Sequence, residues 1–334
     1  MGQRLEHEDI LQLFRAHPGT LLSGEEISRK LGVSRTAVWK KIRHLRSLGY
    51  AIEALPSRGY RLTSLPDVLL AEEVRAGLKT RIIGRELVFF DETDSTNLRA
   101  RELGDGGHPE GTVVIADRQT AGKGRLGRCW ASPPAVNLYT SILLRPPILP
   151  YDGPQLTFLS AVAVARAVAE IGGLRPLVKW PNDVLLGGRK VAGLLNEMNA
   201  ETEGVRYIVL GIGVNLNMRP GQFPDDLRYP ATSLAIETGR EVSRLAFARA
   251  LYRHLDSLYG EYLASGFPPI IRAWEAMCNL IGREVEVDCQ SRLIRGRVEG
   301  LDTDGGLLVC DEGGRLEKIL AGDVRPLERS TPAG

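Results

Sequence analysis

The chain has 334 residues, of which 43% are hydrophobic and 25% charged, and its net charge is +2. These values are those of an ordinary globular protein with two or three domains. The four cysteines lie far apart without metal-like spacing, and neither a signal peptide nor an apolar run long enough to span a bilayer is evident. We therefore expect a cytoplasmic protein with reduced thiols and no membrane partner.

The first 65 residues carry the basic excess of the chain, with 11 Lys and Arg against 6 Asp and Glu. Apolar spacing, capping residues and turn residues predict three helices followed by two short strands, at 8–17, 23–31, 34–48, 50–54 and 59–62. A tight Gly32–Val33 turn separates the last two helices. Helix, glycine turn, helix and hairpin predict a winged helix-turn-helix domain over residues 1–65.

The third predicted helix is basic on one face. Between Ser34 and Leu48 it holds five Lys and Arg and no acid, whereas a solvated surface helix usually mixes both signs. Such a helix after a turn suits the major groove of DNA; a merely basic surface helix is the alternative. The residues expected to contact DNA are Ser34, Arg35, Thr36, Trp39, Lys40 and Arg43 of this helix and Arg58 of the wing.

A glycine-rich, cationic loop runs from Gln119 to Trp130 after a predicted buried strand. Glycine permits positive φ and close approach of a ligand to the backbone, and arginine can engage an anion bidentately. The loop contains a G-x-G-x-x-G, but the prolines at 133–134 prevent the helix that a dinucleotide fold needs, and no Walker Lys-Ser/Thr is present. The alternatives are a solvated basic hairpin tip and an anion clamp for a nucleotide or acyl-adenylate.

Residues 66–280 predict a mixed sheet with helices on one side, which is the α+β class. Strands are expected at 86–90, 111–116, 137–144, 177–180, 184–186, 190–197 and 207–217, and helices at 68–78, 94–103, 156–171, 244–263 and 270–280. Asp94 or Ser95 could cap the second of these helices. Short alternating strands and glycine turns then predict a small β-barrel over residues 281–334.

Five motifs in order resemble those of the biotin protein ligases. They are the cationic loop, Asp94–Asn97, Lys179–Asp183, Arg189–Leu195 and Gly211–Asn217. The combination is highly specific, because lipoate ligases share the fold but do not carry this set together. The resemblance covers most of the chain. It implies a central domain like that of class II aminoacyl-tRNA synthetases and an SH3-like C-terminal domain.

The resemblance implies a two-step reaction and assigns the site. Biotin and ATP would form biotinyl-5′-AMP, and a lysine of a biotin carboxyl carrier protein would then take the biotin. Lys190 and Arg125 would act in catalysis. Biotin would contact Ser95, Thr96, Asn97, Gln119, Lys123, Gly124, Arg125 and Lys190. ATP would contact Arg125, Arg128, Trp130, Asn182, Asp183 and Asn215, with Mg²⁺ at Asp183. Lys123 stands where the family usually has Arg, so the charge is kept but the bidentate fork is lost.

The N-terminal domain implies a second role, because the ligases that also repress transcription carry one. The expected partners are operator DNA and a second copy of the chain, with dimerisation promoted by biotinyl-AMP. Two alternatives stay open: a ligand-sensing transcription factor that has lost catalysis, and a ligase for another acyl group such as lipoate. The presence of Arg125, Arg128, Lys190 and Asp183 argues against the first.

Overall fold

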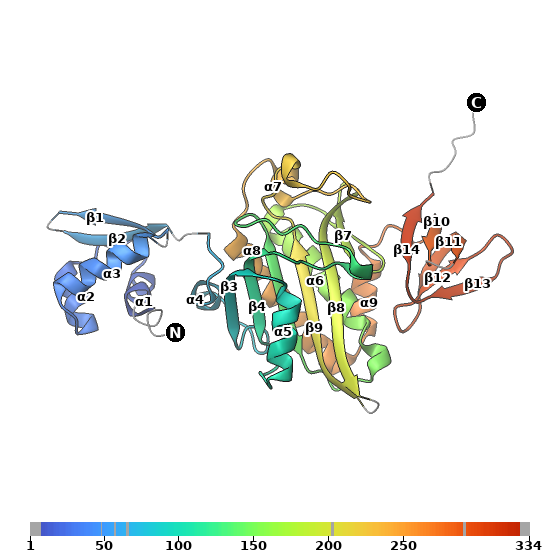
Figure 1. The fold of residues 1–334 in the computed structure, drawn as a ribbon, viewed down its shortest axis with the longest axis horizontal. Helices are drawn as coiled ribbons and strands as arrows, with labels where there is room; N and C mark the ends of the chain where they lie inside the picture. Colours follow the sequence, from blue (N-terminus) through green and yellow to red (C-terminus); the bar gives the residue numbers. More distant parts are fainter. Residues whose placement is uncertain are drawn as a thin grey trace. The chain divides into compact units, whose positions relative to one another are not determined.

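A computed structural model describes residues 8–47, 49–56, 58–64, 67–201, 204–289 and 292–327 of the chain. The chain divides into two compact units, Met1–Val68 and Leu69–Gly334. Figure 1 draws both units with their elements labelled. Each unit has its own hydrophobic core.

The N-terminal unit is a winged helix-turn-helix, as predicted. Its elements are α1 (Glu8–Ala16), α2 (Gly24–Leu31), α3 (Arg35–Ser47), β1 (Ala51–Leu55) and β2 (Gly59–Ser64), with the two strands antiparallel. Gly32 adopts the left-handed conformation that ends α2, and the Ser34 hydroxyl accepts the N–H of Ala37 at the start of α3. The predicted end of the third helix at Leu48 lies outside the described residues.

The second unit is built on a seven-stranded mixed sheet of order β3-β4-β5-β9-β8-β7-β6. Its strands are β3 (Leu87–Thr93), β4 (Val113–Gln119), β5 (Leu138–Leu144), β6 (Leu177–Lys179), β7 (Asp183–Leu186), β8 (Arg189–Glu201) and β9 (Gly204–Val214). β3 and β4 run parallel, and every other neighbouring pair is antiparallel. β8 is the longest strand and continues well past the end of its shorter neighbour β7.

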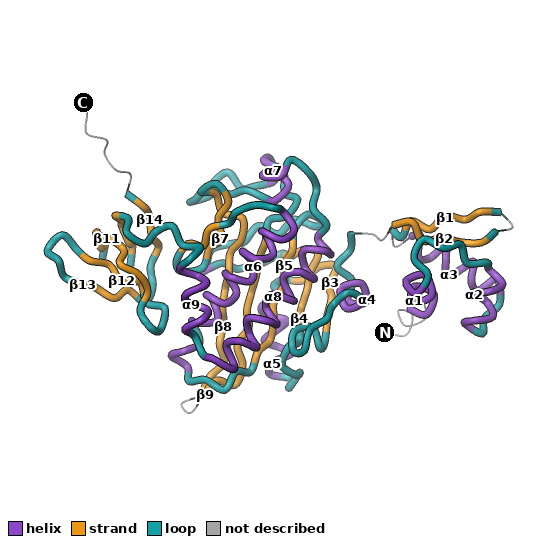
Figure 2. The backbone as a smooth tube through the Cα atoms, turned by 180° about the vertical axis from the view of Figure 1, so that it is seen from behind, coloured by secondary structure: helices purple, strands orange, loops and turns teal. Residues whose placement is uncertain are grey.

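Helices cover both faces of this sheet, so the expectation of helices on one side was wrong. α5 (Thr96–Asp105) lies on one face in Figure 1, whereas α6 (Gln155–Gly172), α8 (Arg244–Ser265) and α9 (Pro268–Glu275) lie in front of the other face in Figure 2. β4 shows the reason: Val113 and Ile115 join the main core, while Val114 joins a second cluster with Ala100 of α5. A strand buried on both faces carries a continuous apolar run, so the run at 113–116 indicates two covered faces without saying which helix covers which.

Two predicted helices are shorter in the structure. α4 is confined to Ala71–Ala76, and α9 ends at Glu275 instead of reaching Leu280. The chain leaves α9 because Val178 of β6 donates its N–H to the carbonyl of Met277. A further short helix, α7, covers Leu234–Thr238.

Among the described residues, the segment Pro150–Gly172 is long and apolar enough by composition to cross a membrane, but 67% of its most apolar part is buried inside the fold. It is the central helix of the core.

The C-terminal strands form a five-stranded antiparallel sheet of order β13-β12-β11-β10-β14. They are β10 (Glu284–Asp288), β11 (Leu293–Leu301), β12 (Leu307–Cys310), β13 (Leu316–Ile319) and β14 (Asp323–Pro326). This sheet packs against the β6–β7 turn and against α6 and α9. The indole N–H of Trp180 donates to the carbonyl of Gly305 at 3.1 Å, and a Cβ on Gly305 would stand 2.5 Å from the ring of Phe158.

Candidate active site

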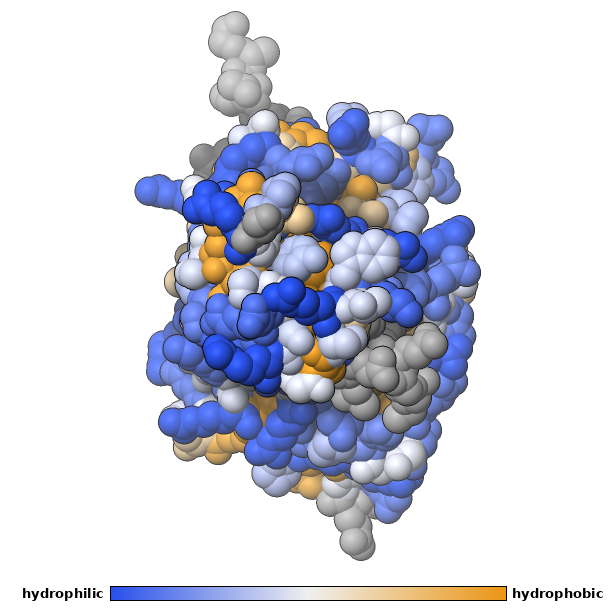
Figure 3. Space-filling model, turned by 90° about the vertical axis from the view of Figure 1, so that its left-hand side faces the viewer, coloured by the Kyte–Doolittle hydropathy of each residue, from blue (hydrophilic) through white to orange (hydrophobic). Residues whose placement is uncertain are grey.

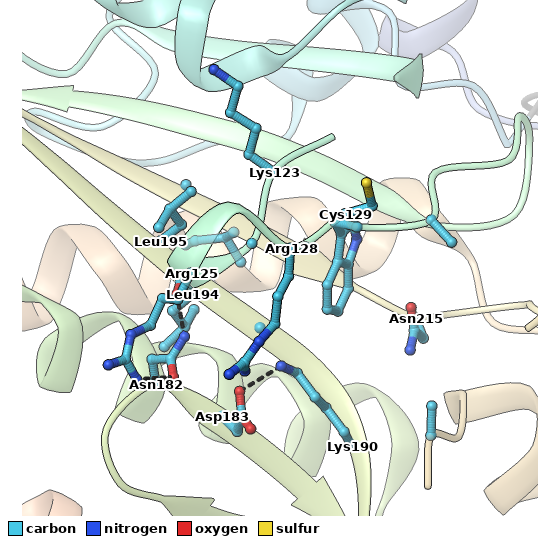
Figure 4. Close-up of a pocket in the computed structure, with 18 of the residues that line it drawn as sticks. Lys123, Arg125, Arg128, Cys129, Asn182, Asp183, Lys190, Leu194, Leu195 and Asn215 are labelled. Carbon is cyan, nitrogen blue, oxygen red and sulfur yellow. Dashed lines mark hydrogen bonds and ion pairs between the residues drawn. The ribbon is translucent and has the colours of Figure 1, made fainter. Parts of the chain in front are cut away.

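A pocket of about 190 Å³ lies where the loop between β4 and β5 crosses β8 and β9. Figure 4 shows side chains from this loop, from the β6–β7 turn and from β8 converging on it. Every residue predicted for biotin or ATP lines this one pocket: Ser95, Thr96, Asn97, Gln119, Lys123, Gly124, Arg125, Arg128, Trp130, Asn182, Asp183, Lys190 and Asn215. The fold therefore brings together five motifs that are far apart in the sequence.

One end of the pocket is buried and polar. Thr96 donates its backbone N–H and its hydroxyl to Oε1 of Gln119, at 2.9 and 3.2 Å. Asn97 donates from Nδ2 to Oε2 of Glu197 at 2.7 Å, and its Oδ1 accepts from Ser141 at 2.6 Å. Thr96 and Asn97 are each only 4% exposed. A buried set of fixed donors and acceptors can recognise a small polar ring.

The expectation that Asp94 or Ser95 caps α5 was wrong. Ser95 holds the N-cap position, but its side chain makes no capping hydrogen bond. The carboxylate of Asp94 accepts the N–H of Ser95, which precedes the helix, at 2.7 Å. Ser95 is only 2% exposed and lines the pocket. Helix capping therefore does not account for a serine at this position.

Glycines in β8 and β9 make room for two pocket side chains. A Cβ on Gly211 would stand 2.2 Å from Oδ1 of Asn97, and a Cβ on Gly213 would stand 2.6 Å from the Trp130 ring. A Cβ on Gly193 would meet the other end of that ring at 2.8 Å. These glycines let side chains lie directly on the sheet backbone. The indole N–H of Trp130 is buried without a hydrogen-bond partner.

The other end of the pocket is cationic. Nζ of Lys190 lies 2.6 Å from Oδ1 of Asp183 and 5.4 Å from the centre of the Trp130 ring. Arg125 donates to Oδ1 of Asn182 at 3.2 Å, and Asn182 is held in turn by the carbonyl of Leu194. Burial lowers the pKa of Arg125, but a guanidinium remains charged in proteins. Two cations fixed this way can neutralise charge that develops on a reacting phosphate.

The remaining predicted residues differ in exposure. Lys123 is exposed and extends away from the cluster of Arg125, Asp183 and Lys190 in Figure 4. Asn215 is 4% exposed, and its amide is occupied by the carbonyl of Thr232 at 3.1 Å. Thus Asn215 shapes the pocket wall, while Lys123 stands at the open side.

Several pocket residues had no predicted role. Asp323 of β14 and Arg228 and Tyr229 of the loop before α7 all line the pocket. Nζ of Lys179, which is 8% exposed, lies 3.8 Å from the centre of the Tyr229 ring, and burial lowers its pKa. Lys179 lies within one of the five motifs, and that motif could have singled it out. Asp323, Arg228 and Tyr229 carry no local signal.

Two carboxylates line the pocket, and one of them, Asp323, is paired with two arginines, which leaves Asp183 as the candidate for a metal ion. Across the described ranges, no group of three or more His, Cys, Asp and Glu side chains is placed to hold a metal. The predicted magnesium ligand Asp183 stands in the pocket beside Lys190. One carboxylate suits Mg²⁺ that keeps several waters and is bound largely through substrate phosphates. The donor set therefore fits a nucleotide-borne ion.

The predicted DNA contacts lie on the outer side of α3. Arg35, Thr36, Lys40 and Arg43 are exposed, and Trp39 is 49% exposed with the Arg43 guanidinium 5.0 Å from its ring centre. Ser34 before the helix and Arg58 in the wing turn are exposed as well. The inward face, Val38, Ile42 and Leu45, is buried. The face of the molecule in Figure 3 is mostly hydrophilic, with hydrophobic side chains only in small separate areas.

This sheet, with a cationic loop closed over glycine-rich strands, is of the type found in the biotin and lipoate ligases. The sequence profile of the biotin/lipoate A/B protein ligase family matches residues 89–215. Profiles of a helix-turn-helix domain and of the biotin protein ligase C-terminal domain match residues 6–61 and 280–325.

Individual relatives agree with these profiles. The chain is 40% identical to the bifunctional ligase/repressor BirA of Bacillus subtilis over 95% of this chain and 97% of that protein. Identity to the protein of that name from Escherichia coli is 31%, over 92% and 93%. The biotin protein ligase of Aquifex aeolicus in complex with biotin and ATP is similar in structure, with a TM-score of 0.62, 30% identity and coverage of 73% and 99%. The chain belongs to the biotin protein ligase family.

Proposed function

We propose that this protein is a cytoplasmic biotin protein ligase that also acts as a biotin-responsive transcriptional repressor. As a ligase it joins biotin to a lysine of a biotin carboxyl carrier protein of the acetyl-CoA carboxylase type. The observation that carries the proposal is the single pocket with a buried polar end at Thr96 and Asn97 and a cationic end at Arg125 and Lys190. Biotin has a polar ring at one end and a carboxylate at the other, and ATP adds the phosphates.

In the first step the biotin carboxylate attacks the α-phosphorus of ATP. The new P–O bond forms as the bond to the β-phosphate breaks, and pyrophosphate leaves. Lys190 and Arg125 neutralise the charge that gathers on the carboxylate and the phosphate oxygens, while the hydrogen-bonded residues around Thr96 hold the ring. Neither this step nor the transfer to lysine that follows requires an enzyme nucleophile. When bound, Mg²⁺ supplies further neutralisation of the phosphates, with Asp183 as the protein carboxylate that holds it.

In the second step an uncharged lysine amine of the carrier protein attacks the biotinyl carbonyl, AMP leaves with the electron pair of the broken C–O bond, and the nitrogen releases one proton to solvent as the amide forms. Lys190 and Arg125 again face the departing phosphate. Trp130 closes the pocket against Gly213 and Gly193, which supports the role assigned to it in holding the nucleotide. Exclusion of water by this ring would protect the anhydride from hydrolysis.

Repression requires a dimer, because one helix-turn-helix reads only a short half-site. The central sheet supports dimerisation through β8. Its partner β7 reaches only as far as Gly193, whereas β9 follows β8 to Glu201. In the described part of the chain no strand covers the outer edge beyond that point, where Met198 is 43% exposed. An uncovered strand edge readily pairs with another chain.

The decisive experiment is incubation of the protein with ATP, Mg²⁺, labelled biotin and a biotin carrier domain. We expect label on one lysine of the carrier domain, dependent on both ATP and Mg²⁺. Transfer of labelled lipoate in place of biotin would contradict the proposed substrate. If neither conjugate forms, the protein would be a ligand-sensing transcription factor without ligase activity.

A further inference from the structure

A carboxylate from the C-terminal sheet reaches into the wall of the active-site pocket. Oδ2 of Asp323, at the start of β14, accepts hydrogen bonds from Nη2 of Arg128 at 2.5 Å and from Nη1 of Arg228 at 2.6 Å. The Asp323 side chain is 13% exposed, whereas the two arginine side chains are 40% and 34% exposed. A single carboxylate oxygen thus holds two partly exposed guanidinium groups together.

The two arginines come from different loops on the rim of the pocket. Arg128 belongs to the cationic loop after β4, and Arg228 belongs to the loop between β9 and α7. Both line the pocket together with Asp323. Two guanidinium groups repel each other, so the carboxylate between them is what lets both loops present positive charge at one place. Burial would raise the pKa of Asp323, but the hydrogen bond and charge of Arg128 and the charge of Arg228 outweigh it and lower that pKa.

Both arginines keep hydrogen-bond donors that Asp323 does not engage. Each guanidinium carries five N–H donors, and the Asp323 contact engages one nitrogen of each. Donors therefore remain for a ligand in the pocket. An arginine side chain loses rotamer freedom when it is held in one place. A carboxylate that has already ordered both arginines removes part of this cost from ligand binding.

We propose that Asp323 is a positioning residue for ATP, which holds Arg128 and Arg228 so that both guanidinium groups face the triphosphate. The C-terminal sheet thereby completes the nucleotide end of the pocket. This inference rests on the proposed ligase function and deepens it. Asp323 does not touch the reacting atoms; it acts through the two arginines.

The strand pairing supplies a matched control. Asp288 of β10 lies directly opposite Asp323 in the β10–β14 pair, and it contacts Arg228 at 3.2 Å. Its side chain is 42% exposed. Asp288→Asn therefore removes the same charge from the same sheet without freeing Arg128.

The test is the rate of pyrophosphate release with full-length protein, measured against ATP and biotin separately. For Asp323→Asn we expect the KM for ATP to rise roughly 10- to 100-fold, by analogy with the residues that orient metal ligands. The KM for biotin at saturating ATP should stay near that of the wild type. Asp288→Asn should change either constant by less than about threefold, and Asp323→Glu should restore much of the ATP affinity.

An unchanged KM for ATP in Asp323→Asn would overturn the inference. Equal increases in KM for ATP and biotin, together with a lower melting temperature, would also overturn it, because they would indicate a purely structural role. The wild-type protein separates this result from the proposed function. If the wild type releases no biotin-dependent pyrophosphate, the ligase function itself fails.

Discussion

Lys190 is the residue on which the proposed chemistry depends most directly. Its ammonium group is held by Asp183 at 2.6 Å and stands over the Trp130 ring, so it has a fixed place at the cationic end of the pocket. Its neighbour Arg189 points elsewhere and pairs with Glu237 at 2.7 Å. Two adjacent cations of one motif thus have different surroundings, and only Lys190 lines the pocket.

Lys190→Ala should slow adenylate formation roughly 100-fold or more, because it removes charge that opposes the developing negative charge. The measurement is single-turnover pyrophosphate release at saturating biotin and ATP. Arg189→Ala is the matched control and should leave the rate within about twofold. An unchanged rate in Lys190→Ala would make this lysine a bystander.

Gly213→Ala tests the space that β9 leaves for Trp130. The new methyl group would stand 2.6 Å from the ring, so the indole must move off the sheet. Overpacking of this kind costs about 1–3 kcal/mol, and we expect weaker binding of biotinyl-AMP, measured by titration calorimetry or displacement. Gly204→Ala in the same strand meets nothing within 4 Å and should bind normally. Equal affinities in the two variants would refute the role given to Trp130.

At the scale of elements, the loop from Gln119 to Trp130 is tied to its surroundings at its start, where Thr120 and Ala121 donate to the carbonyls of Thr93 and Asp94 at 2.9 Å, and across its base. Gly124 donates its N–H to the carbonyl of Arg128 at 2.7 Å, and Trp130 donates to Gly122 at 2.9 Å. Between these points Leu126 has a φ of 57° and is 57% exposed. A non-glycine residue in this conformation is uncommon. Bound ligand would therefore add substantially to the order of this loop.

Arg125→Ala should release biotinyl-AMP faster, because the variant lacks the cation that faces the adenylate phosphate. Stopped-flow dissociation of the preformed intermediate measures this rate. Arg118→Ala is the comparison, since Arg118 lies near the end of β4 and pairs with Glu92 on the surface. If both variants dissociate like the wild type, Arg125 does not hold the phosphate.

The outer edge of β8 gives a second prediction at this scale. Met198→Glu should weaken dimerisation in the presence of biotin and ATP, since burial of a charge against an apolar partner is costly. Sedimentation at several concentrations measures the effect. The first half-reaction should continue in the monomer, because Met198 does not line the active-site pocket. A dimer of normal strength would place the interface elsewhere.

At the scale of the whole molecule, the ligase unit and the DNA-binding unit have separate cores. We therefore expect any coupling to act through the dimer. We expect biotinyl-AMP to order the cationic loop, and a loop that is already ordered costs less entropy to bury in an interface. The adenylate should thus promote dimerisation and operator binding together.

Replacement of Lys40, Arg43 and Arg58 by alanine should weaken DNA binding and flatten its salt dependence, by about one unit of slope for each phosphate that is no longer neutralised. Biotin transfer should stay unchanged. Lys30→Ala, on α2 and paired with Glu26, is the control. The measurement is anisotropy on the promoter of a biotin-synthesis operon, with and without ATP and biotin. Equal DNA affinity with and without ATP and biotin would mean that ligand binding and DNA binding are not coupled in this ligase.

The sequence alone was sufficient for the features that depend on neighbouring residues. The helices and strands of the N-terminal unit follow from apolar spacing, a capping serine and a left-handed glycine, all of which act within one turn of the chain. The motif residues of the pocket could likewise be named, because the order and spacing of the five motifs resemble those of the biotin protein ligases. Their chemistry is a property of the residue types themselves.

Only the tertiary structure decided which distant residues join them. Arg128 and Asp323 are 195 positions apart, and Asn97 and Glu197 are 100 apart. The placement of α5 on the opposite face of the sheet from α6 was also decided by the tertiary structure, since a continuous apolar run indicates two covered faces but does not say which helix covers which. Contacts of this kind arise when strand order and sheet packing bring separate segments to one place. No local periodicity in the sequence indicates such long-range contacts. The contact of the Asp323 carboxylate with two pocket arginines could therefore be seen only in the fold.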